Sequence, residues 1–554
     1  MKLKFTNNFI GYFTFYYSVL GKKIIINFLL CIAVSFLDGI GLAMFIPLLQ
    51  AVESGHTNGG GDSMGKLSFI TDFISFIGLD LSIAVVLGIL LLLFAVKGLF
   101  KYIQLSYQVR MRHTFMKRIR YTLVSDLHNL TYQGYLKLDA GRIQNTLIAE
   151  VQRLFQTMDR YFNAAQASVM LLTYVLLAFL ANYQFAIFVG IGAALSNFLY
   201  RKIYIATKKA SMDLSKSGDD FNGLLIQAIY NFKYLKATDY FNTFDKKLKT
   251  VINQTENLNK KIGSYNAISV SVKEPMIIGI VVLVIYIQVS WIGASLSSII
   301  LSLLLFYRAL TFLVMVQNHW QNFIANIGAM FSVTEFANEM QANQESKNEM
   351  SFSHLDNCIF LNNINFSYGE TLVLNNINIE IKKNKTIAFI GESGSGKTTL
   401  ANLIAALLQP TSGELLINDK NINAYNLNSY RSKIGYISQD PVIFNDDIFN
   451  NITFWAEKTD ENVKRFWQIV NLSALREFIE NQPSKELTYL GDNGILISGG
   501  QKQRISIARE LYKQAEILIL DEATSALDSE TEKIIKDNID FLHGKYTIIV
   551  IAHR

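Results

Sequence analysis

A glycine-rich run of eight residues has the composition of a phosphate-binding loop. The run 391–398 is Gly-Glu-Ser-Gly-Ser-Gly-Lys-Thr. It follows the apolar stretch 386–390 and precedes 399–408, whose apolar spacing predicts a helix. A strand, a glycine-rich turn and a helix let backbone N–H groups and a helix N-terminus hold phosphate oxygens. We predict that Lys397 contacts the β- and γ-phosphates of a nucleotide and that the Thr398 hydroxyl binds Mg²⁺.

Polar residues follow several apolar, strand-like stretches further along the chain. Asp521 and Glu522 end one such stretch, Gln439 follows a second, and His553 follows a third. In an open α/β sheet, ligands bind at the carboxyl ends of the strands. Asp521 suits water-mediated coordination of Mg²⁺, and Glu522 suits polarisation of the attacking water. Each residue alone is common, but together and in this order they predict nucleotide hydrolysis.

A second glycine-rich turn opens another predicted helix. Its residues are Ser498, Gly499, Gly500 and Gln501. Ser498 can cap the helix, which leaves N–H groups at the helix start to receive another phosphate.

The bulk composition indicates a membrane half and a soluble half. The chain has 554 residues, is half hydrophobic and has a mean hydropathy of +0.23, with the apolar excess before residue 320. The formal net charge is +6, which in a membrane protein fits basic loops beside anionic lipid. No nucleic-acid partner is predicted. The two cysteines have no CxxC or metal-ligand spacing, so neither a disulfide framework nor a zinc site is supported.

Six apolar runs are predicted to cross a membrane. They are 24–49, about 81–104, 162–180, 185–205, 277–289 and about 294–316. The segments 97–161 and 201–273 are rich in Lys and Arg, so the positive-inside rule places both termini in the cytoplasm. These segments are predicted to be helices that continue into the cytoplasm and turn back. The turns at 135–142 and 221–236 either touch the soluble half or are ordinary solvated loops.

Three features of the membrane half are unusual. Asp38 lies near the middle of the first run and Arg308 near the middle of the sixth. Buried charges at such depth face protein or water, so the two residues either pair with each other or contact a substrate. The outer segment 66–77 is apolar and aromatic at helical spacing, and it either lies at the lipid interface or packs on the spans.

The organisation resembles an ATP-binding cassette exporter, with the membrane domain fused ahead of the ATPase domain. The resemblance implies a helical six-span domain of the type IV exporter fold at 1–335, a linker at 336–357, and an α/β P-loop ATPase domain at 358–554. Short antiparallel strands are expected at 359–369 and 371–381. Family members usually continue past the histidine that matches His553, which makes this C-terminal domain short.

The resemblance also assigns roles to individual residues. Tyr368 would stack on adenine, and ATP phosphates would be held by Gly391, Glu392, Ser393, Gly394, Ser395, Gly396, Lys397, Thr398 and Thr399. Gln439 would touch Mg²⁺ and sense the membrane domain, Glu522 would be the catalytic base, and His553 would contact the γ-phosphate. Ser498 to Gln501 would be the signature that completes the ATP site of a second copy, and Asp528 would be the D-loop acid.

One membrane domain with one ATPase domain is half of a transporter in this family, so a dimer is implied. The chain keeps Glu522 and the signature, which favours a homodimer over a heterodimer with a degenerate partner. The chain is similar to lipid-linked oligosaccharide flippases in Asp38, Pro47 and the Tyr307-Arg308 pair. This implies a lipid-linked substrate and a bacterial inner membrane. A peptide or drug-like amphiphile as substrate, and an ATP-gated channel or regulator, remain as alternatives.

Overall fold

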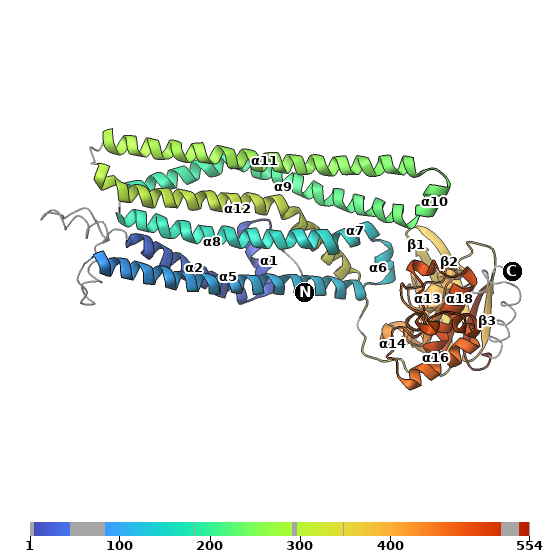
Figure 1. The fold of residues 1–554 in the computed structure, drawn as a ribbon. Coiled ribbons are helices and arrows are strands. Elements are labelled where there is room, and N and C mark those ends of the chain that lie inside the picture. Colours follow the sequence, from blue (N-terminus) through green and yellow to red (C-terminus); the bar gives the residue numbers. More distant parts are fainter. Residues whose placement is uncertain are drawn as a thin grey trace. The chain divides into compact units, whose positions relative to one another are not determined.

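The computed structural model describes residues 5–44, 83–181, 183–290, 296–346, 348–521 and 542–552. The chain folds into two compact units, shown in Figure 1. One unit is formed by Met1–Leu130 and Leu136–Gln344, and the other by Thr131–Tyr135 and Glu345–Arg554.

The first unit is built from long helices that run alongside one another (Figure 1). The long helices are α2 (Lys23–Ala43), α5 (Ile83–His128), α8 (Val151–Ala181), α9 (Tyr183–Tyr230), α11 (Phe241–Ser290) and α12 (Leu296–Ala342). Each contains one of the six predicted apolar runs, or most of it, and α5, α9, α11 and α12 continue well beyond their runs, as predicted. Among the described residues, Lys23–Gly41 and Ile83–His128 are long and apolar enough to cross a membrane. The outer segment 66–77 lies outside the described residues.

A short aromatic helix, α1 (Phe9–Leu20), precedes the first long helix. The Asn8 side chain accepts a hydrogen bond from the Gly11 N–H at 2.7 Å and so caps the helix. The Tyr16 hydroxyl lies 2.9 Å from the Thr157 hydroxyl of α8. These contacts, together with buried aromatic rings of α1, α5, α8 and α12, form the core of the first unit.

The remaining helical elements of the first unit lie in the turns. They are α6 (Tyr132–Leu136), α7 (Ala140–Asn145), a π-helical turn at Thr146–Glu150, and α10 (Phe232–Ala237). Within the turn predicted at 135–142, the side chains of Tyr135, Leu136 and Lys137 are exposed. The segment just before it, Thr131–Tyr135, belongs to the second unit, where Tyr132 packs on the apolar core.

Helix α12 continues to Ala342, beyond the expected end of the membrane domain at residue 335, so the expected linker at 336–357 begins inside a helix. The cause is local packing: Phe336, Ala337 and Met340 are fully buried in the core of the first unit. After residue 338 the buried Met340 stands among polar residues, so the composition there did not indicate a helix packed in the core.

The second unit contains two sheets. The antiparallel sheet has the order β2-β1-β4-β5, with β1 (Cys358–Tyr368), β2 (Thr371–Lys382), β4 (Ser412–Ile417) and β5 (Lys420–Asn421). The parallel sheet has the order β3-β8-β7-β6, with β3 (Thr386–Ile390), β6 (Ile434–Ile437), β7 (Ile517–Asp521) and β8 (Thr547–Ala552). Both predicted antiparallel strands are confirmed.

Helices complete this α/β unit. They are α13 (Lys397–Ile404), α14 (Leu427–Arg431), α15 (Ile448–Thr453), α16 (Asp460–Leu472), α17 (Arg476–Glu480) and α18 (Gly499–Tyr512). Short 3₁₀ turns lie at Ile422–Ala424, Lys485–Leu487 and Asp492–Gly494. Every residue of β7 is buried, as expected for a central parallel strand.

Candidate functional site

The glycine-rich run lies between β3 and α13, which confirms the predicted strand, turn and helix. Gly396 caps α13 with φ +89°, and a Cβ there would lie 2.8 Å from Leu374 Cδ2, so glycine is required. The Lys397 ammonium donates to the carbonyl oxygens of Gly391 and Glu392, both at 2.8 Å. These contacts hold the ammonium against the loop. The helix start supplies N–H groups beside it, so the loop has the donors that phosphate oxygens need.

Strand pairing brings the predicted polar residues to one edge of the parallel sheet. Ile551 of β8 is paired with Asp521 of β7. Ala552 is paired with Ile390, the residue before the phosphate loop. Strand β6 lies on the other side of β7, and Gln439 follows β6 by two residues. The phosphate loop, Asp521 and Gln439 therefore follow strands whose carboxyl ends share an edge, as the sequence predicted.

Three predicted site residues lie outside the described part of the chain. They are Glu522, Asp528 and His553. Glu522 directly follows Asp521 in the sequence, and His553 directly follows Ala552. Their catalytic roles remain predictions.

Asp521 has a neighbour that the sequence reasoning missed. The Tyr436 hydroxyl, on β6, lies 3.4 Å from Asp521 Oδ2 and 3.2 Å from Asn402 Oδ1. Burial and the nearby Asp521 carboxylate raise the pKa of Tyr436, so the phenol keeps its proton. The phenol therefore orients an acid that is a candidate for Mg²⁺ coordination. The available signal was a hydroxyl-bearing aromatic residue within an otherwise apolar strand.

The remaining nucleotide residues occupy suitable places. Thr398 is exposed in the first turn of α13, and Thr399, behind it, is buried. The Tyr368 ring is 44% exposed at the end of β1 and packs edge-on against Phe366, with ring centroids 4.8 Å apart. Its free face fits the predicted stacking on adenine.

The signature turn begins α18 with a capping box. The Gln501 N–H donates to the Ser498 hydroxyl at 3.3 Å, and the Ser498 N–H donates to Gln501 Oε1 at 2.8 Å. Gly499 and Gly500 form the first helical turn. The structure therefore confirms the predicted cap, and its phosphate contact in a second copy remains a prediction.

The far part of α18 carries a buried arginine that the sequence reasoning also missed. Arg509 donates to the carbonyl oxygens of Asn451 and Val442, each at 2.7 Å. Its guanidinium lies over the rings of Phe444 and Phe454. It thereby ties the signature helix to the segment that follows Gln439. Because an arginine within an amphipathic helix is usually exposed, the burial of Arg509 could not be predicted from the sequence.

The helical unit contains a cavity of about 390 Å³ lined by charged side chains. Lys97 and Lys101 lie one turn apart on α5, Arg308 comes from α12, and Asp38 comes from α2. Three cations against one carboxylate leave a net charge of +2. Phe312, Met315 and His319 continue the lining along α12. The cavity therefore offers cationic and apolar surface side by side.

Of the two alternatives for Asp38 and Arg308, the structure does not show their pairing with each other. Asp38 forms an ion pair with Lys97, and its Oδ2 accepts a hydrogen bond from the Tyr174 hydroxyl at 2.9 Å. Among the described residues, no ion pair joins Arg308 to a carboxylate. The arginine lines the cavity with Asp38 but is not neutralised by it.

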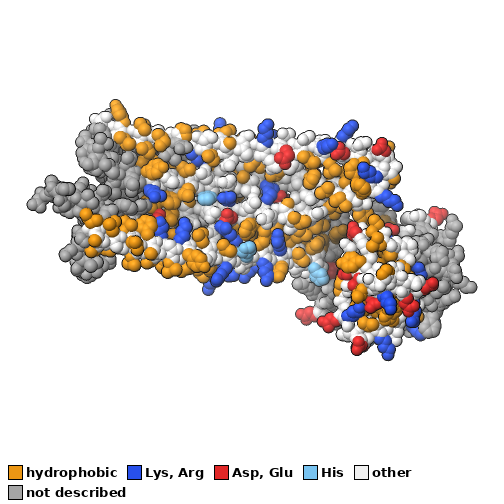
Figure 2. Space-filling model, viewed as in Figure 1, with side chains coloured by type: hydrophobic (Ala, Val, Ile, Leu, Met, Phe, Trp, Pro, Cys, Tyr) orange, Lys and Arg blue, Asp and Glu red, His pale blue; other side chains and the backbone are white. Residues whose placement is uncertain are grey.

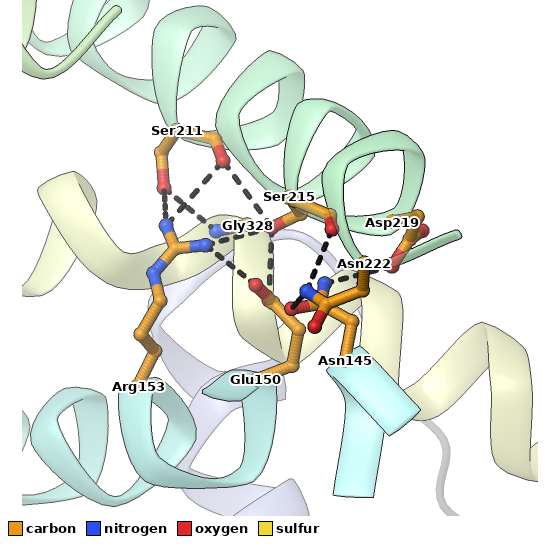
Figure 3. Close-up of polar contacts among 9 residues, drawn as sticks. Asn145, Glu150, Arg153, Ser211, Ser215, Asp219, Asn222 and Gly328 are labelled. Atoms are coloured by element: carbon orange, nitrogen blue, oxygen red, sulfur yellow. Dashed lines mark hydrogen bonds and ion pairs between the residues drawn. The ribbon is translucent and has the colours of Figure 1, made fainter. Parts of the chain in front are cut away.

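A polar cluster joins the continuations of α8, α9 and α12 (Figure 3). Arg153 donates to Glu150 Oε1 at 2.8 Å, to the Ser215 hydroxyl at 3.0 Å and to the Ser211 hydroxyl at 3.2 Å. Ser215 in turn donates to Glu150 Oε2 at 2.9 Å. The Gly328 N–H of α12 donates to the Ser211 hydroxyl at 3.0 Å, and a Cβ on Gly328 would lie 2.1 Å from the Ser211 carbonyl oxygen. The three helices are therefore held in direct backbone proximity.

The same cluster continues to α7. Asn145 Nδ2 donates to Asp219 Oδ1 at 2.8 Å, and Asn222 donates to Asn145 Oδ1 at 3.1 Å. Burial raises the pKa of Asp219 to about 6, and the nearby Glu150 adds to the rise. A Cβ on Gly141 would lie 2.2 Å from the Gly223 N atom, so α7 touches α9 at backbone level.

Taken together, these features define a class of protein: a helical membrane domain joined to a P-loop ATPase domain. Two family models match it. The ABC transporter transmembrane region matches residues 24–315, and the ABC transporter model matches residues 374–525. The chain belongs to the ABC transporter family. It is a multi-pass membrane protein whose ATPase is coupled to transport.

Curated relatives resemble the chain over most of its length. The heterocyst differentiation ATP-binding protein HepA of Nostoc sp. is 30% identical over 451 residues, which cover 79% of this chain and 72% of that protein. The ATP-dependent lipid A-core flippase of Coxiella burnetii is 27% identical, covering 84% of this chain and 79% of that protein. The flippase of the same name from Syntrophus aciditrophicus is 29% identical, covering 84% and 78%.

A solved structure shares the fold. It is described as a bacterial Atm1-family ABC exporter with ATP bound, and it matches with a TM-score of 0.75 at 20% sequence identity. The match covers 97% of this chain and 91% of that one. The exporter fold predicted from the sequence is thereby confirmed.

Proposed function

We propose that the protein uses ATP hydrolysis to flip an anionic lipid, best described as a phosphate- or pyrophosphate-linked lipid, across the inner membrane of a bacterium. The observation that carries this proposal is the cavity with a net charge of +2 beside apolar side chains. A planar guanidinium such as that of Arg308 suits phosphate oxygens, and the ammonium groups of Lys97 and Lys101 add point charges. The two relatives named as lipid A-core flippases support a lipid substrate.

The proposed working form is a homodimer with both termini and both ATPase domains in the cytoplasm. A signature turn that begins with a capped helix start fits a phosphate of the ATP bound by a second copy. ATP and Mg²⁺ are the proposed ligands of each site: the phosphate loop would hold the phosphates, and Thr398, Gln439 and, through water, Asp521 would hold the metal. Mg²⁺ supplies neutralisation of the charge that develops on the phosphates.

In the proposed cycle, ATP binding draws the two ATPase domains together and turns the cavity from inward to outward access. Hydrolysis then resets it. Asp38 takes part when the substrate enters the cavity. Its carboxylate forms an ion pair with Lys97, so an entering phosphate competes with that carboxylate for the ammonium. The competition favours groups that carry more than one negative charge.

The test is lipid translocation and ATPase activity of the full chain in proteoliposomes, with Glu522→Gln as the background. Polyprenyl-pyrophosphate glycolipid, zwitterionic phospholipid and a hydrophobic peptide are compared. We expect selective stimulation by the glycolipid, and loss of that stimulation in Arg308→Ala and Lys101→Ala. Arg120→Ala is the matched control, because Arg120 is an exposed cation on the same helix as Lys101.

Three results would count against parts of the proposal. Stimulation by peptide alone would move the substrate class to peptides. ATP-dependent conductance without translocation would indicate a channel. Unchanged turnover in Glu522→Gln would remove that residue as the catalytic base, since the base is required to polarise the attacking water.

A further inference from the structure

Four side-chain amides lie at the contact between α5 and α8, beside the cavity that contains Arg308. Gln104 Nε2 donates to Gln166 Oε1 at 3.1 Å, and Gln108 Nε2 donates to Asn163 Oδ1 at 3.2 Å. Gln104 and Gln108 are buried, whereas Asn163 and Gln166 line the cavity. We call these four residues the amide cluster. Its two α5 members hold its two α8 members at the cavity wall.

The amide cluster has hydrogen-bonding groups that the described part of the chain does not use. Among the described residues, the NH₂ group of Gln166 has no acceptor, and that of Asn163 has one long contact, to Asp159 Oδ2 at 3.4 Å. Gln104 Oε1 is buried there without a hydrogen-bond partner. Unused amide donors and acceptors at a cavity wall are groups that a polar ligand satisfies.

Carboxamides and hydroxyl groups complement each other. An amide presents an acceptor oxygen and two N–H donors, and a hydroxyl both donates and accepts. Asn163 and Gln166 are three residues apart on α8, so their amides lie on the same face of the helix and reach the same cavity. A sugar ring carries several hydroxyls at fixed positions, so it can engage both amides at once.

The charge of the cavity narrows the kind of group that the amides meet. Lys97, Lys101 and Arg308 against Asp38 leave a net charge of +2. This charge attracts a phosphate but repels a headgroup that ends in an ammonium, such as that of phosphatidylethanolamine. The group attached to the phosphate should therefore be neutral and rich in hydroxyls, as a sugar is.

The amide cluster lies at a suitable level for a group attached to the phosphate. Lys101 and Gln104 are three residues apart on α5, so about one helical turn separates a cation from the amides. Gln104 ends the second apolar run and Asn163 lies at the start of the third, whereas Arg308 is near the middle of the sixth. In the proposed orientation, the amides are on the cytoplasmic side of Arg308, so a phosphate on the cations would leave its sugar beside them.

The size of the cavity separates the sugar from the lipid chain. Its volume of about 390 Å³ is near the lower end of the range for small-molecule sites, about 300–1,000 Å³, so it suits a phosphate with an adjoining sugar. The chain has other surface available, because Figure 2 shows hydrophobic side chains over broad areas of the helical unit. On α8 itself, Leu172, Leu176 and Phe179 are exposed beyond the amide cluster.

We propose that the amide cluster recognises the sugar attached directly to the phosphate of the transported lipid. Gln166 and Asn163 are the contacts, and Gln104 and Gln108 are positioning residues. This inference rests on the proposed function, because it takes the transported molecule to be a phosphate-linked lipid. It adds that the molecule is a glycolipid. Since the cations bind the phosphate with or without a sugar, the amides set the selectivity for the glycolipid.

The test compares two lipids that differ only in the sugar: polyprenyl pyrophosphate and polyprenyl-pyrophosphate-N-acetylglucosamine. The lipid concentration that gives half of the maximal ATPase stimulation is measured in proteoliposomes, with Glu522→Gln as the background. We expect the sugar lipid to act at about tenfold lower concentration, and Gln166→Leu to reduce this preference about three- to tenfold, as the loss of about one net hydrogen bond predicts. The response of Gln166→Leu to the sugar-free lipid should stay unchanged. The matched control is Gln156→Leu, which removes an exposed glutamine of the same helix and should keep the full preference.

A second variant keeps the test decisive if Gln166→Leu is poorly folded. The double variant Gln104→Leu, Gln166→Leu removes both members of one hydrogen-bonded pair, so neither amide is left facing an apolar partner, and it should lose the same preference. Arg308→Ala should weaken the response to both lipids, which separates the phosphate contact from the sugar contact. An equal response of the unmodified protein to the two lipids would overturn this inference and leave the proposed function standing, as would a full preference in both Gln166 variants. Stimulation by neither lipid would refute the proposed function and this inference with it.

Discussion

The buried ion pair between Arg153 and Glu150 allows a quantitative prediction. Its arginine also donates hydrogen bonds to Ser211 and Ser215 of α9, so the pair lies at the contact between α8 and α9. The side chain of Glu150 is 3% exposed and that of Arg153 is 17% exposed. Changing Arg153 to Met leaves a buried carboxylate whose remaining contact within the cluster in Figure 3 is the Ser215 hydroxyl. Removing one partner of a buried pair typically costs about 3–5 kcal/mol, because the other charge stays desolvated.

The size of the expected effect follows from that cost. At about 2 °C per kcal/mol for a large domain, the apparent Tm of Arg153→Met should fall by roughly 6–10 °C. The assay is thermal unfolding followed by tryptophan fluorescence in nanodiscs. The double variant Glu150→Met, Arg153→Met removes both charges, and an apolar replacement of a whole buried pair is often nearly neutral. We therefore expect the double variant to be more stable than Arg153→Met alone.

The control is an exposed pair with the same chemistry. Arg476 and Glu480 form an ion pair at 2.8 Å with side chains 59% and 47% exposed. Exposed pairs on a helix contribute about 0.3–0.5 kcal/mol, so Arg476→Met should barely change the apparent Tm. If Arg153→Met behaves like Arg476→Met, or if the double variant loses as much as both single variants added together, the buried-pair reasoning is refuted.

Two further predictions concern titration and catalysis. Burial raises the pKa of Asp219 to about 6 in the folded state, so its contribution to stability is present at low pH and is lost as the pH rises through 6. Asp219→Asn should therefore be more stable than the unmodified protein at pH 7.5, should keep roughly half of this gain at pH 5, and should lose it below about pH 4, where the carboxyl is protonated in the unfolded state as well; thermal unfolding at the three pH values measures the gain, and a constant difference would contradict it. Tyr436→Phe should lower the kcat for ATP about two- to fivefold with little change in ATP affinity, because Asp521 loses one long hydrogen bond. Steady-state ATPase assays check this, and an unchanged kcat would show that the phenol does not orient the acid.

The nucleotide residues could be predicted from the sequence because their chemistry is local. The phosphate loop and the signature turn each place backbone N–H groups within one short segment, so spacing alone identifies them. The helix cap by Ser498 lies within a four-residue pattern, 498–501, and the structure confirms it. The apolar strand before Asp521 likewise predicted its position at the sheet edge.

The partners of charged residues in the helical unit could not be predicted in the same way. Asp38 and Lys97 are 59 residues apart and come from different helices. In the sequence, Lys97 was assigned to the start of a basic cytoplasmic segment. A single lysine near the end of an apolar run does not show whether its long side chain points to the cytoplasm or to a neighbouring helix. Arg308 was the more conspicuous charge, so it was the residue considered as a partner for Asp38, with a substrate contact as the alternative. The end of α12 was missed for a related reason, since sparse apolar residues such as Phe336 are recognised as core only when their neighbours are known.

The two halves of the chain therefore place their chemistry in different ways, and this decides which experiments are informative. At the proposed nucleotide site, backbone N–H groups would supply most phosphate contacts, so variants of Glu522 or Tyr436 test catalysis more sharply than they test binding. In the helical unit, the proposed anion contacts are side chains from separate helices, Lys97 and Lys101 on α5 and Arg308 on α12, and each can be removed alone. If Lys101→Ala and Arg308→Ala each lose stimulation by the glycolipid while the basal ATPase activity is unchanged, the two helices contribute to one anion site. Loss in only one of the two variants would limit the site to that helix.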